Sequence, residues 1–212
     1  MSDSSNNKAK MLDLMNVVST KDVFTNEELD LIIKLGTSEE TSTGLTPARV
    51  GQGLGVTDET GQTGLAGSGV RQCSVSGIGS STETDWIFER IREVVRDANI
   101  AYFNFNINAI AVLQLVKYDG TESPEFYIQH IDLGKSDIDA QRKLSFTLQL
   151  SDPNDYDGGN LLLYHVVGGA VTANRERGAI TIFPSFMPHE VTPVTQGIRY
   201  SLVAWTLGPA FR

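Results

Sequence analysis

The stretch Tyr127-Ile128-Gln129-His130-Ile131-Asp132, followed later by Pro188-His189-Glu190-Val191, decides how this sequence is interpreted. His130 and Asp132 are two residues apart in a segment that reads as a strand, so both side chains are expected on one face. A second histidine, His189, comes from another predicted strand. Two histidines and one carboxylate on one side of a metal, with open positions opposite, form the facial triad typical of non-haem Fe(II) sites.

The sequence around these residues is organised in short strands. Beyond Ala101 the apolar period is two, with Phe103, Phe105 and Ile107 alternating with asparagines, and strand follows strand to the end. Gly, Pro and Asp break the runs, and no long helix separates them. This predicts a mostly β fold with flanking helices (α+β), either a barrel or a two-sheet jelly roll. Earlier strands are expected within Met11–Ser19 and Val70–Gly77.

Two helices are expected on the outside of the β core. The first has an N-cap at Thr25, with Glu28 three residues on, and ends near Gly36. The second runs from about Thr84 to Asn99 and gathers its apolar residues on one face. The arginines of this second helix are predicted to form a solvated face, and they are Arg90, Arg92 and Arg96.

The length of 212 residues fits one domain. We expect a disordered tail over 1–10 and a single domain over 11–212, with helical support in 11–100 and the jelly-roll core in 101–212. The segment 37–69 is rich in glycine and low in large apolar residues. It is predicted to be a mobile flap near the site, and a surface excursion is the alternative.

Composition limits the possible partners. The net charge of −9 argues against a protein that binds mainly phosphate, so no nucleic-acid partner is expected. The single cysteine, Cys73, excludes an internal disulfide and is expected to be a buried strand residue. The polar start lacks a signal peptide, and no run is long enough to cross a membrane. A cytoplasmic protein without a membrane partner is predicted.

Several short motifs follow one another along the second half of the chain. They are Tyr127-x-x-His130-x-Asp132, Leu144-Ser145, Leu150-Ser151-Asp152, Tyr156-x-Gly158-Gly159, Phe183-Pro184-Ser185, His189-Glu190-Val191-x-Pro193-Val194 and Gly197-x-Arg199-Tyr200-Ser201. In this order and spacing the chain resembles the 2-oxoglutarate-dependent Fe(II) dioxygenases of the prolyl 4-hydroxylase superfamily, and among them the bacterial and phage-type hydroxylases. The resemblance is close over Val116–Arg212 and looser from Phe24 onward.

The resemblance implies a double-stranded β-helix core and a set of cofactors. These are Fe(II), 2-oxoglutarate and O2, with an ascorbate requirement left open. His130, Asp132 and His189 would be the catalytic metal ligands. Arg199, ten residues after His189, would pair with the far carboxylate of 2-oxoglutarate, a task that suits a guanidinium fork. The hydroxyl of Tyr118 would help to hold the same co-substrate.

Two further residues are candidates for the wall of the co-substrate site. Gln149 shares the inward face of its predicted strand with Ser145 and Thr147, and it stands where many relatives carry an aromatic residue. Trp205 alternates onto the face of Arg199 and is expected either to wall the pocket or to be plain core. His165 lies outside every motif and is predicted to be structural or exposed.

The implied reaction is hydroxylation of a C–H bond, with a proline-containing peptide or protein as the expected substrate and a free amino acid or small metabolite as an alternative. Asp132 argues against a related halogenase, which lacks this carboxylate. A nucleic-acid demethylase would carry a second arginine where Trp205 stands. A non-catalytic jelly-roll binding module remains open, as does a hydrolytic or isomerising metalloprotein, which would not need Arg199. Substrate choice is expected to lie in segments 37–69 and 133–143.

Overall fold

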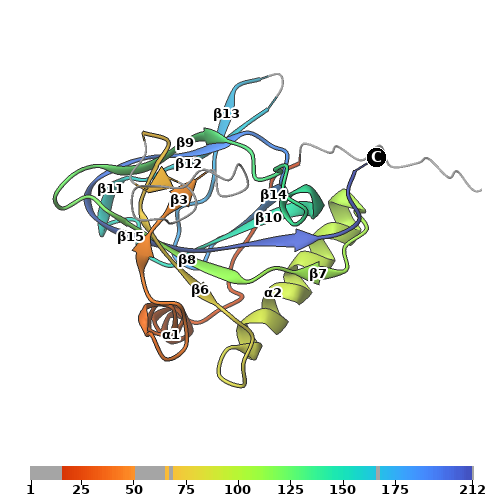
Figure 1. Cartoon of the computed structure of the whole chain (residues 1–212), viewed down its shortest axis with the longest axis horizontal. Coiled ribbons are helices and arrows are strands. Elements are labelled where there is room, and N and C mark those ends of the chain that lie inside the picture. The colour runs from red at the N-terminus through yellow and green to blue at the C-terminus, as the bar shows by residue number, and fades with distance from the viewer. Residues whose placement is uncertain (1–15, 51–64, 67–68, 166–167, 212) are drawn as a thin grey trace, which may run out of the picture.

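The computed structural model describes residues 16–50, 65–66, 69–165 and 168–211, and all that follows concerns these residues. They form a mostly antiparallel β structure with two α-helices on its outside (Figure 1). The predicted tail at 1–10 lies outside the described residues, as do residues 51–64 and 67–68 of the glycine-rich segment 37–69. None of the helices in the described ranges is both long and apolar enough to span a membrane.

The larger sheet contains the strands that support the site from below. All its strand pairs are antiparallel. In order they are β1 (Val18–Thr20), β14 (Ile180–Pro184), β10 (Arg142–Gln149), β15 (His189–Leu207), β8 (Leu113–Asp119), β6 (Ser74–Ile78) and β2 (Thr46–Pro47), with β7 (Ala109–Ile110) at the end of β15.

The smaller sheet faces it and shares one strand with it. Its members are β13 (Ala170–Thr172), β12 (Leu161–Tyr164), the first part of β15, β9 (Glu125–His130) and β5 (Arg71–Gln72), with β11 (Tyr156–Gly158) also on β15. A separate hairpin pairs β3 (Arg49–Val50) with β4 (Leu65–Ala66). The early part of β15 pairs with β9 and β12, and its later part pairs with β8 and β10. This two-sheet arrangement confirms the predicted jelly roll.

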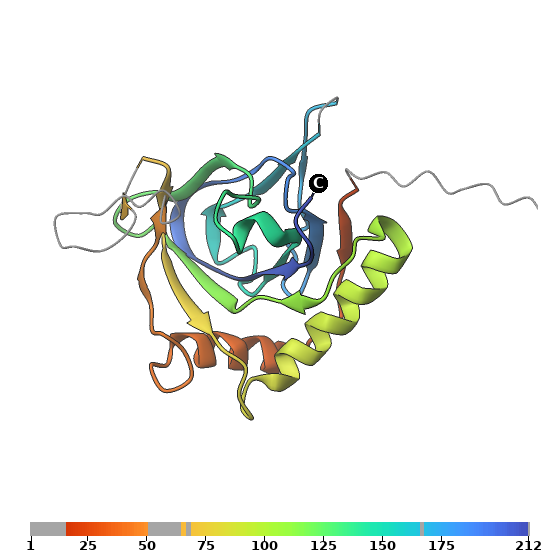
Figure 2. The same cartoon turned by 45° about the vertical axis from the view of Figure 1, so that its right-hand side comes forward.

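Both predicted helices are present, and they cover the outer face of the larger sheet (Figure 2). Helix α1 (Asn26–Thr37) has the full capping box between Thr25 and Glu28. Helix α2 (Asp85–Ala98) buries an apolar face and passes into a π-helical turn, Asn99–Phe103. Arg92 and Arg96 are exposed, as predicted, and the Arg90 side chain is 39% exposed while its Nη1 also lies 2.6 Å from the Glu28 carboxylate and links the two helices.

Three predicted strands differ from the structure. Phe103, Phe105 and Ile107 do not form a strand, because Asn99 holds the Phe105 backbone through its side-chain amide and Asn104 adopts a positive φ of 56°. The alternation of apolar residues with asparagines therefore does not indicate a strand here. Of the strand predicted within Met11–Ser19, residues 11–15 lie outside the described part of the chain, and β1 begins at Val18. The strand predicted over Val70–Gly77 is divided at Cys73 into β5 and β6.

The buried apolar side chains form two clusters on opposite faces of the larger sheet. The outer cluster joins the helices to the sheet through residues such as Ile87, Ile91 and Leu148. The inner cluster lies between the two sheets and includes Tyr118 and Phe183. The inner cluster surrounds the candidate site, so the helices stabilise the floor of the site without contributing side chains to its cavity.

Candidate metal centre and its cavity

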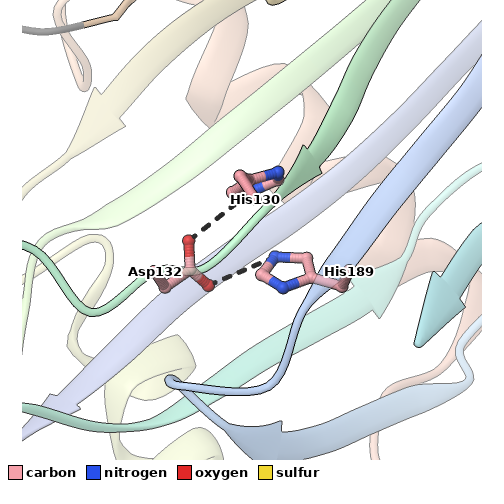
Figure 3. A group of neighbouring side chains, drawn as sticks. All are labelled: His130, Asp132 and His189. Atoms are coloured by element: carbon pink, nitrogen blue, oxygen red, sulfur yellow. Dashed lines mark ion pairs between the residues drawn. The ribbon is translucent and has the colours of Figure 1, made fainter. Parts of the chain in front are cut away.

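Three of the predicted residues meet at the open end of the two sheets. The ligand atoms of His130, Asp132 and His189 all lie within 4.8 Å of one another (Figure 3). One Asp132 oxygen is 3.7 Å from His130 Nε2, and the other is 3.4 Å from His189 Nε2. The pairing of β9 with β15 places His130 directly opposite His189. The sheet register thus joins residues that are far apart in sequence.

Backbone carbonyls orient both imidazoles. His130 Nδ1 lies 2.8 Å from the carbonyl oxygen of Ile128, and His189 Nδ1 lies 2.9 Å from that of Met187. A carbonyl oxygen only accepts, so each Nδ1 must donate a hydrogen. The lone pair then falls on Nε2 in both rings, which is the atom that faces Asp132. Both histidines therefore present a neutral nitrogen donor to the same point.

Asp132 reaches this point from outside the strand. Strand β9 ends at His130, so the expectation that both side chains lie within one strand is wrong in detail. A backbone hydrogen bond from Asp132 to the carbonyl of Ser185 brings the carboxylate back toward the imidazoles. The Ser145 hydroxyl donates to Asp132 Oδ2 at 2.6 Å and fixes its orientation.

Electrostatics favour the protonation states that a metal requires. Burial, together with the neighbouring His189, lowers the pKa of His130 to about 4. Burial by itself would raise the pKa of Asp132, but His189, His130 and the Ser145 hydroxyl outweigh it and lower that pKa. At neutral pH His130 is thus a neutral ligand and Asp132 is an anion, as metal binding demands.

The three residues line a cavity of about 600 Å3 between the sheets. Tyr118 and Trp205 also line it, as predicted, whereas His165 does not. The loop 133–143 contributes to the cavity wall, including Lys135 and Asp139. Gln149 points inward as expected and lies behind this cavity, next to Arg199.

Arg199 is buried in the depth of the cavity and has only neutral partners. It is 2 % exposed; Nη2 donates to Gln149 Oε1 at 3.0 Å, and Nη1 lies 3.4 Å from the Ser201 hydroxyl. Its Nε has no hydrogen-bond partner among the described residues, and none of their carboxylates forms an ion pair with it. A buried guanidinium without an anion is costly, so this pocket suits a ligand with a carboxylate.

Sequence reasoning missed three residues of the wall. The Tyr127 ring stacks on His130 with ring centroids 3.5 Å apart, and the guanidinium carbon of Arg71 lies 4.7 Å from the Tyr127 ring centroid. Arg142 lies 4.0 Å from the Trp205 ring and donates to the Asp132 carbonyl oxygen. Tyr127 belonged to a quoted motif, but no local signal indicated where Arg71 or Arg142 would point.

Comparison with known proteins agrees with this geometry. Residues 113–207 match the family model described as the 2OG-Fe(II) oxygenase superfamily. A PKHD-type hydroxylase of Hyphomonas neptunium is 43% identical over 82 residues, which cover 37% of this chain and 36% of that protein. The PKHD-type hydroxylase PiuC of Pseudomonas aeruginosa is 37% identical over 94 residues, covering 42% and 40%. The matched stretch is thus well under half of these relatives' lengths.

Solved structures share the fold at low sequence identity. A prolyl-4-hydroxylase of Pseudomonas putida has a TM-score of 0.66 and 19% identity, covering 91% of this chain and 92% of that one. A Trichoplax adhaerens prolyl hydroxylase, solved with a hypoxia inducible factor peptide, has a TM-score of 0.69 and 17% identity, covering 90% and 83%. The stretch that matches the 2OG-Fe(II) oxygenase superfamily model, residues 113–207, contains the whole His-Asp-His group.

Proposed function

We propose that this chain is an Fe(II)- and 2-oxoglutarate-dependent dioxygenase that hydroxylates a prolyl residue in a peptide or protein. The observation behind the proposal is the combination of two sites in one cavity. The His-Asp-His group provides a metal site, and the anion-free guanidinium of Arg199 provides a carboxylate site. A hydrolytic metalloprotein would use the first site but would have no use for the second.

The donor set suits ferrous iron. Two imidazole nitrogens and one carboxylate oxygen occupy one side of a metal and leave the other positions open to exogenous ligands. The unpartnered Nε of Arg199 is the sort of buried polar atom that a bound carboxylate would satisfy. When bound, iron and 2-oxoglutarate supply the oxidation, in which O2 is consumed, succinate and CO2 leave, and one oxygen atom enters a C–H bond.

The residues of the chain have separate tasks in this scheme. His130, Asp132 and His189 would hold the metal, and Ser145 keeps the Asp132 carboxylate turned toward it. Arg199 would bind the far carboxylate of the co-substrate, with Gln149 holding the guanidinium in place. Burial raises the pKa of Tyr118, so its hydroxyl stays protonated and can donate a hydrogen bond to that same carboxylate.

The prolyl substrate is supported by the fold relatives. The solved structures that cover nine-tenths of this chain include a prolyl-4-hydroxylase and a prolyl hydroxylase with a bound peptide fragment. The cavity between the sheets has room for a side chain beside the metal group, since its volume is about 600 Å3.

The test is succinate formation from 2-oxoglutarate by purified protein with Fe(II) in air. We expect slow turnover without a prime substrate, lost in His130→Ala and weakened in Arg199→Gln because the co-substrate loses its charge partner. Arg92→Gln removes an arginine from the exposed face of α2 and serves as the matched control. Proline-containing peptides should accelerate the native enzyme and gain one oxygen atom.

Each alternative has its own outcome in this assay. Binding of 2-oxoglutarate without turnover, with or without peptides, would leave a jelly-roll binding module. Succinate release without any hydroxylated peptide would support the oxygenase and reject the prolyl substrate. Equal turnover in the native protein and in Arg199→Gln would contradict the assigned carboxylate site.

A further inference from the structure

The cavity is far more basic than the protein that contains it. The chain has a net charge of −9, yet the charged residues that line the cavity are mainly cations. They are Arg49, Arg71, Lys135, Arg142 and Arg199 against Asp132 and Asp139. Asp139 is already paired with Arg142 at 2.9 Å, and Asp132 faces the two imidazoles. With Arg199 assigned to 2-oxoglutarate, the cationic residues that line the cavity still outnumber the acidic ones.

Among these cations, Arg71 lies over the aromatic ring that stacks on His130. Its Nε donates to Cys73 Sγ at 3.2 Å, and its Nη2 donates to the Gln114 side-chain oxygen at 3.3 Å. Its guanidinium carbon lies 4.7 Å from the centroid of the Tyr127 ring. No carboxylate of the described residues forms an ion pair with it.

The groups that surround Arg71 do not supply a negative charge. Burial raises the pKa of the Cys73 thiol and the pKa of the Tyr118 hydroxyl, so both are neutral at physiological pH. Gln114 is an amide. A half-buried guanidinium held by neutral acceptors retains its full charge and has donors left for an anion.

Arg71 and Arg199 lie in different parts of the cavity. Strand β5 pairs Arg71 with Tyr127 on β9, and the Tyr127 ring stacks in turn on His130. The guanidinium therefore lies one aromatic ring beyond a metal ligand, at the edge of the cavity formed by the smaller sheet. Arg199 extends instead from β15 toward Gln149 on β10. A group reaching Arg71 would come from a substrate lying across the metal group.

We infer that Arg71 is a specificity-determining residue that binds a carboxylate of the prime substrate, which makes the preferred substrate an acidic peptide with Asp or Glu close to the hydroxylated proline. The inference rests on the proposed prolyl hydroxylase function and adds the class of peptide to it. The keto-acid end of 2-oxoglutarate offers the same carboxylate chemistry, so the test must separate these two sources.

The test uses full-length protein with Fe(II), 2-oxoglutarate and a library of end-capped pentapeptides with a central proline and randomised flanks. Mass spectrometry identifies the peptides that gain an oxygen atom. We expect products of the native enzyme to favour Asp and Glu over Asn and Gln by about ten-fold or more, the range of a charge-assisted hydrogen bond. Arg71→Gln should abolish this preference, Arg71→Lys should retain part of it, and the control Arg92→Gln should keep it.

The possible failures are distinguishable. Products without an acidic preference, or a preference that survives in Arg71→Gln, overturn the role of Arg71 while leaving the prolyl hydroxylase intact. If the KM for 2-oxoglutarate rises in Arg71→Gln when no peptide is present, Arg71 binds the co-substrate. That result also overturns the role of Arg71 in binding the peptide. Turnover of 2-oxoglutarate without hydroxylation of any peptide overturns the prolyl substrate and this inference together.

Discussion

Hydroxyl and carbonyl oxygens orient the three side chains of the candidate metal group. The Ile128 and Met187 carbonyls select the ring nitrogens that face Asp132, and Ser145 orients the carboxylate of Asp132. Partners of this kind determine how well a metal is held, because they fix the ligands before the metal arrives. The Ser145 hydroxyl also lies 3.1 Å from the Ser185 hydroxyl, so it is itself held in place.

At this scale we predict that Ser145→Ala weakens metal binding by about 10- to 100-fold, because Asp132 loses the hydroxyl that orients it. Calorimetric titration of the metal-free protein with Mn(II) would measure the loss. Ser74→Ala is a suitable control, since Ser74 lies on β6 and makes no side-chain hydrogen bond to a described residue. An unchanged affinity in Ser145→Ala would show that Asp132 is oriented by the backbone alone.

The elements that hold the site in shape depend on a few local features. Helix α1 begins with a reciprocal pair of hydrogen bonds, from Glu28 N to the Thr25 hydroxyl and from Thr25 N to the Glu28 carboxylate. Strand β15 passes from one sheet to the other near Gly197, which has a φ of +72°. Both features were visible in the sequence as a capping box and as a glycine of the Gly-x-Arg motif.

Thr25→Ala should lower the free energy of unfolding by about 1 kcal/mol, because the first turn of α1 loses an acceptor for a backbone N–H. Urea unfolding followed by circular dichroism would measure it. Glu89→Ala, on the exposed face of α2, should change the same quantity by less than about 0.5 kcal/mol. Equal effects from the two substitutions would argue that the cap contributes nothing.

Gly197→Ala should lower the free energy of unfolding by at least about 2 kcal/mol, more than Thr25→Ala, and should reduce the soluble yield. A Cβ at this position would lie 2.0 Å from the Asp155 carbonyl oxygen in addition to straining the backbone. Gly79→Ala is the matched control, because its Cβ would meet nothing within 4 Å. If both variants unfold at the same urea concentration, the bend at Gly197 is more adaptable than its geometry indicates.

On the scale of the whole molecule, the site is built where folding brings buried titratable groups together. His130 has a folded pKa of about 4, against an ordinary value of 6.5. Between these pH values the unfolded chain binds a proton at this residue and the folded chain does not. The free energy of unfolding of the metal-free protein must therefore fall as the pH drops from about 6.5 to about 4.

The lowered pKa of His130 should reduce the free energy of unfolding of the metal-free protein by about 2 kcal/mol between pH 7 and pH 5. Urea unfolding with a chelator present, at several pH values, would measure it. The variant His130→Gln should lose that part of the pH dependence, whereas Ser74→Ala should keep it. A native protein and a His130→Gln variant with the same pH dependence would contradict the lowered pKa.

The sequence by itself determined the jelly-roll class, helix α1 and the grouping of His130, Asp132 and His189, while the role of Arg199 stays a prediction. These follow from caps, strand alternation and short motifs, which depend on neighbouring residues and so remain readable along the chain. The same local reasoning failed at Phe103–Ile107, because the amide of Asn99 satisfies the Phe105 backbone and removes the need for a strand partner.

Only the tertiary structure decided which distant side chains complete the cavity. Arg71 reaches the site because β5 pairs with β9, and Tyr127 stacks on His130 because the sheet register allows it. Arg90 joins the two helices through Glu28, a contact that the sequence did not indicate. Such contacts depend on sheet register and on packing between residues that are far apart in the chain. A local pattern of residues does not contain this information, because the stabilising contacts form only when the strands pair.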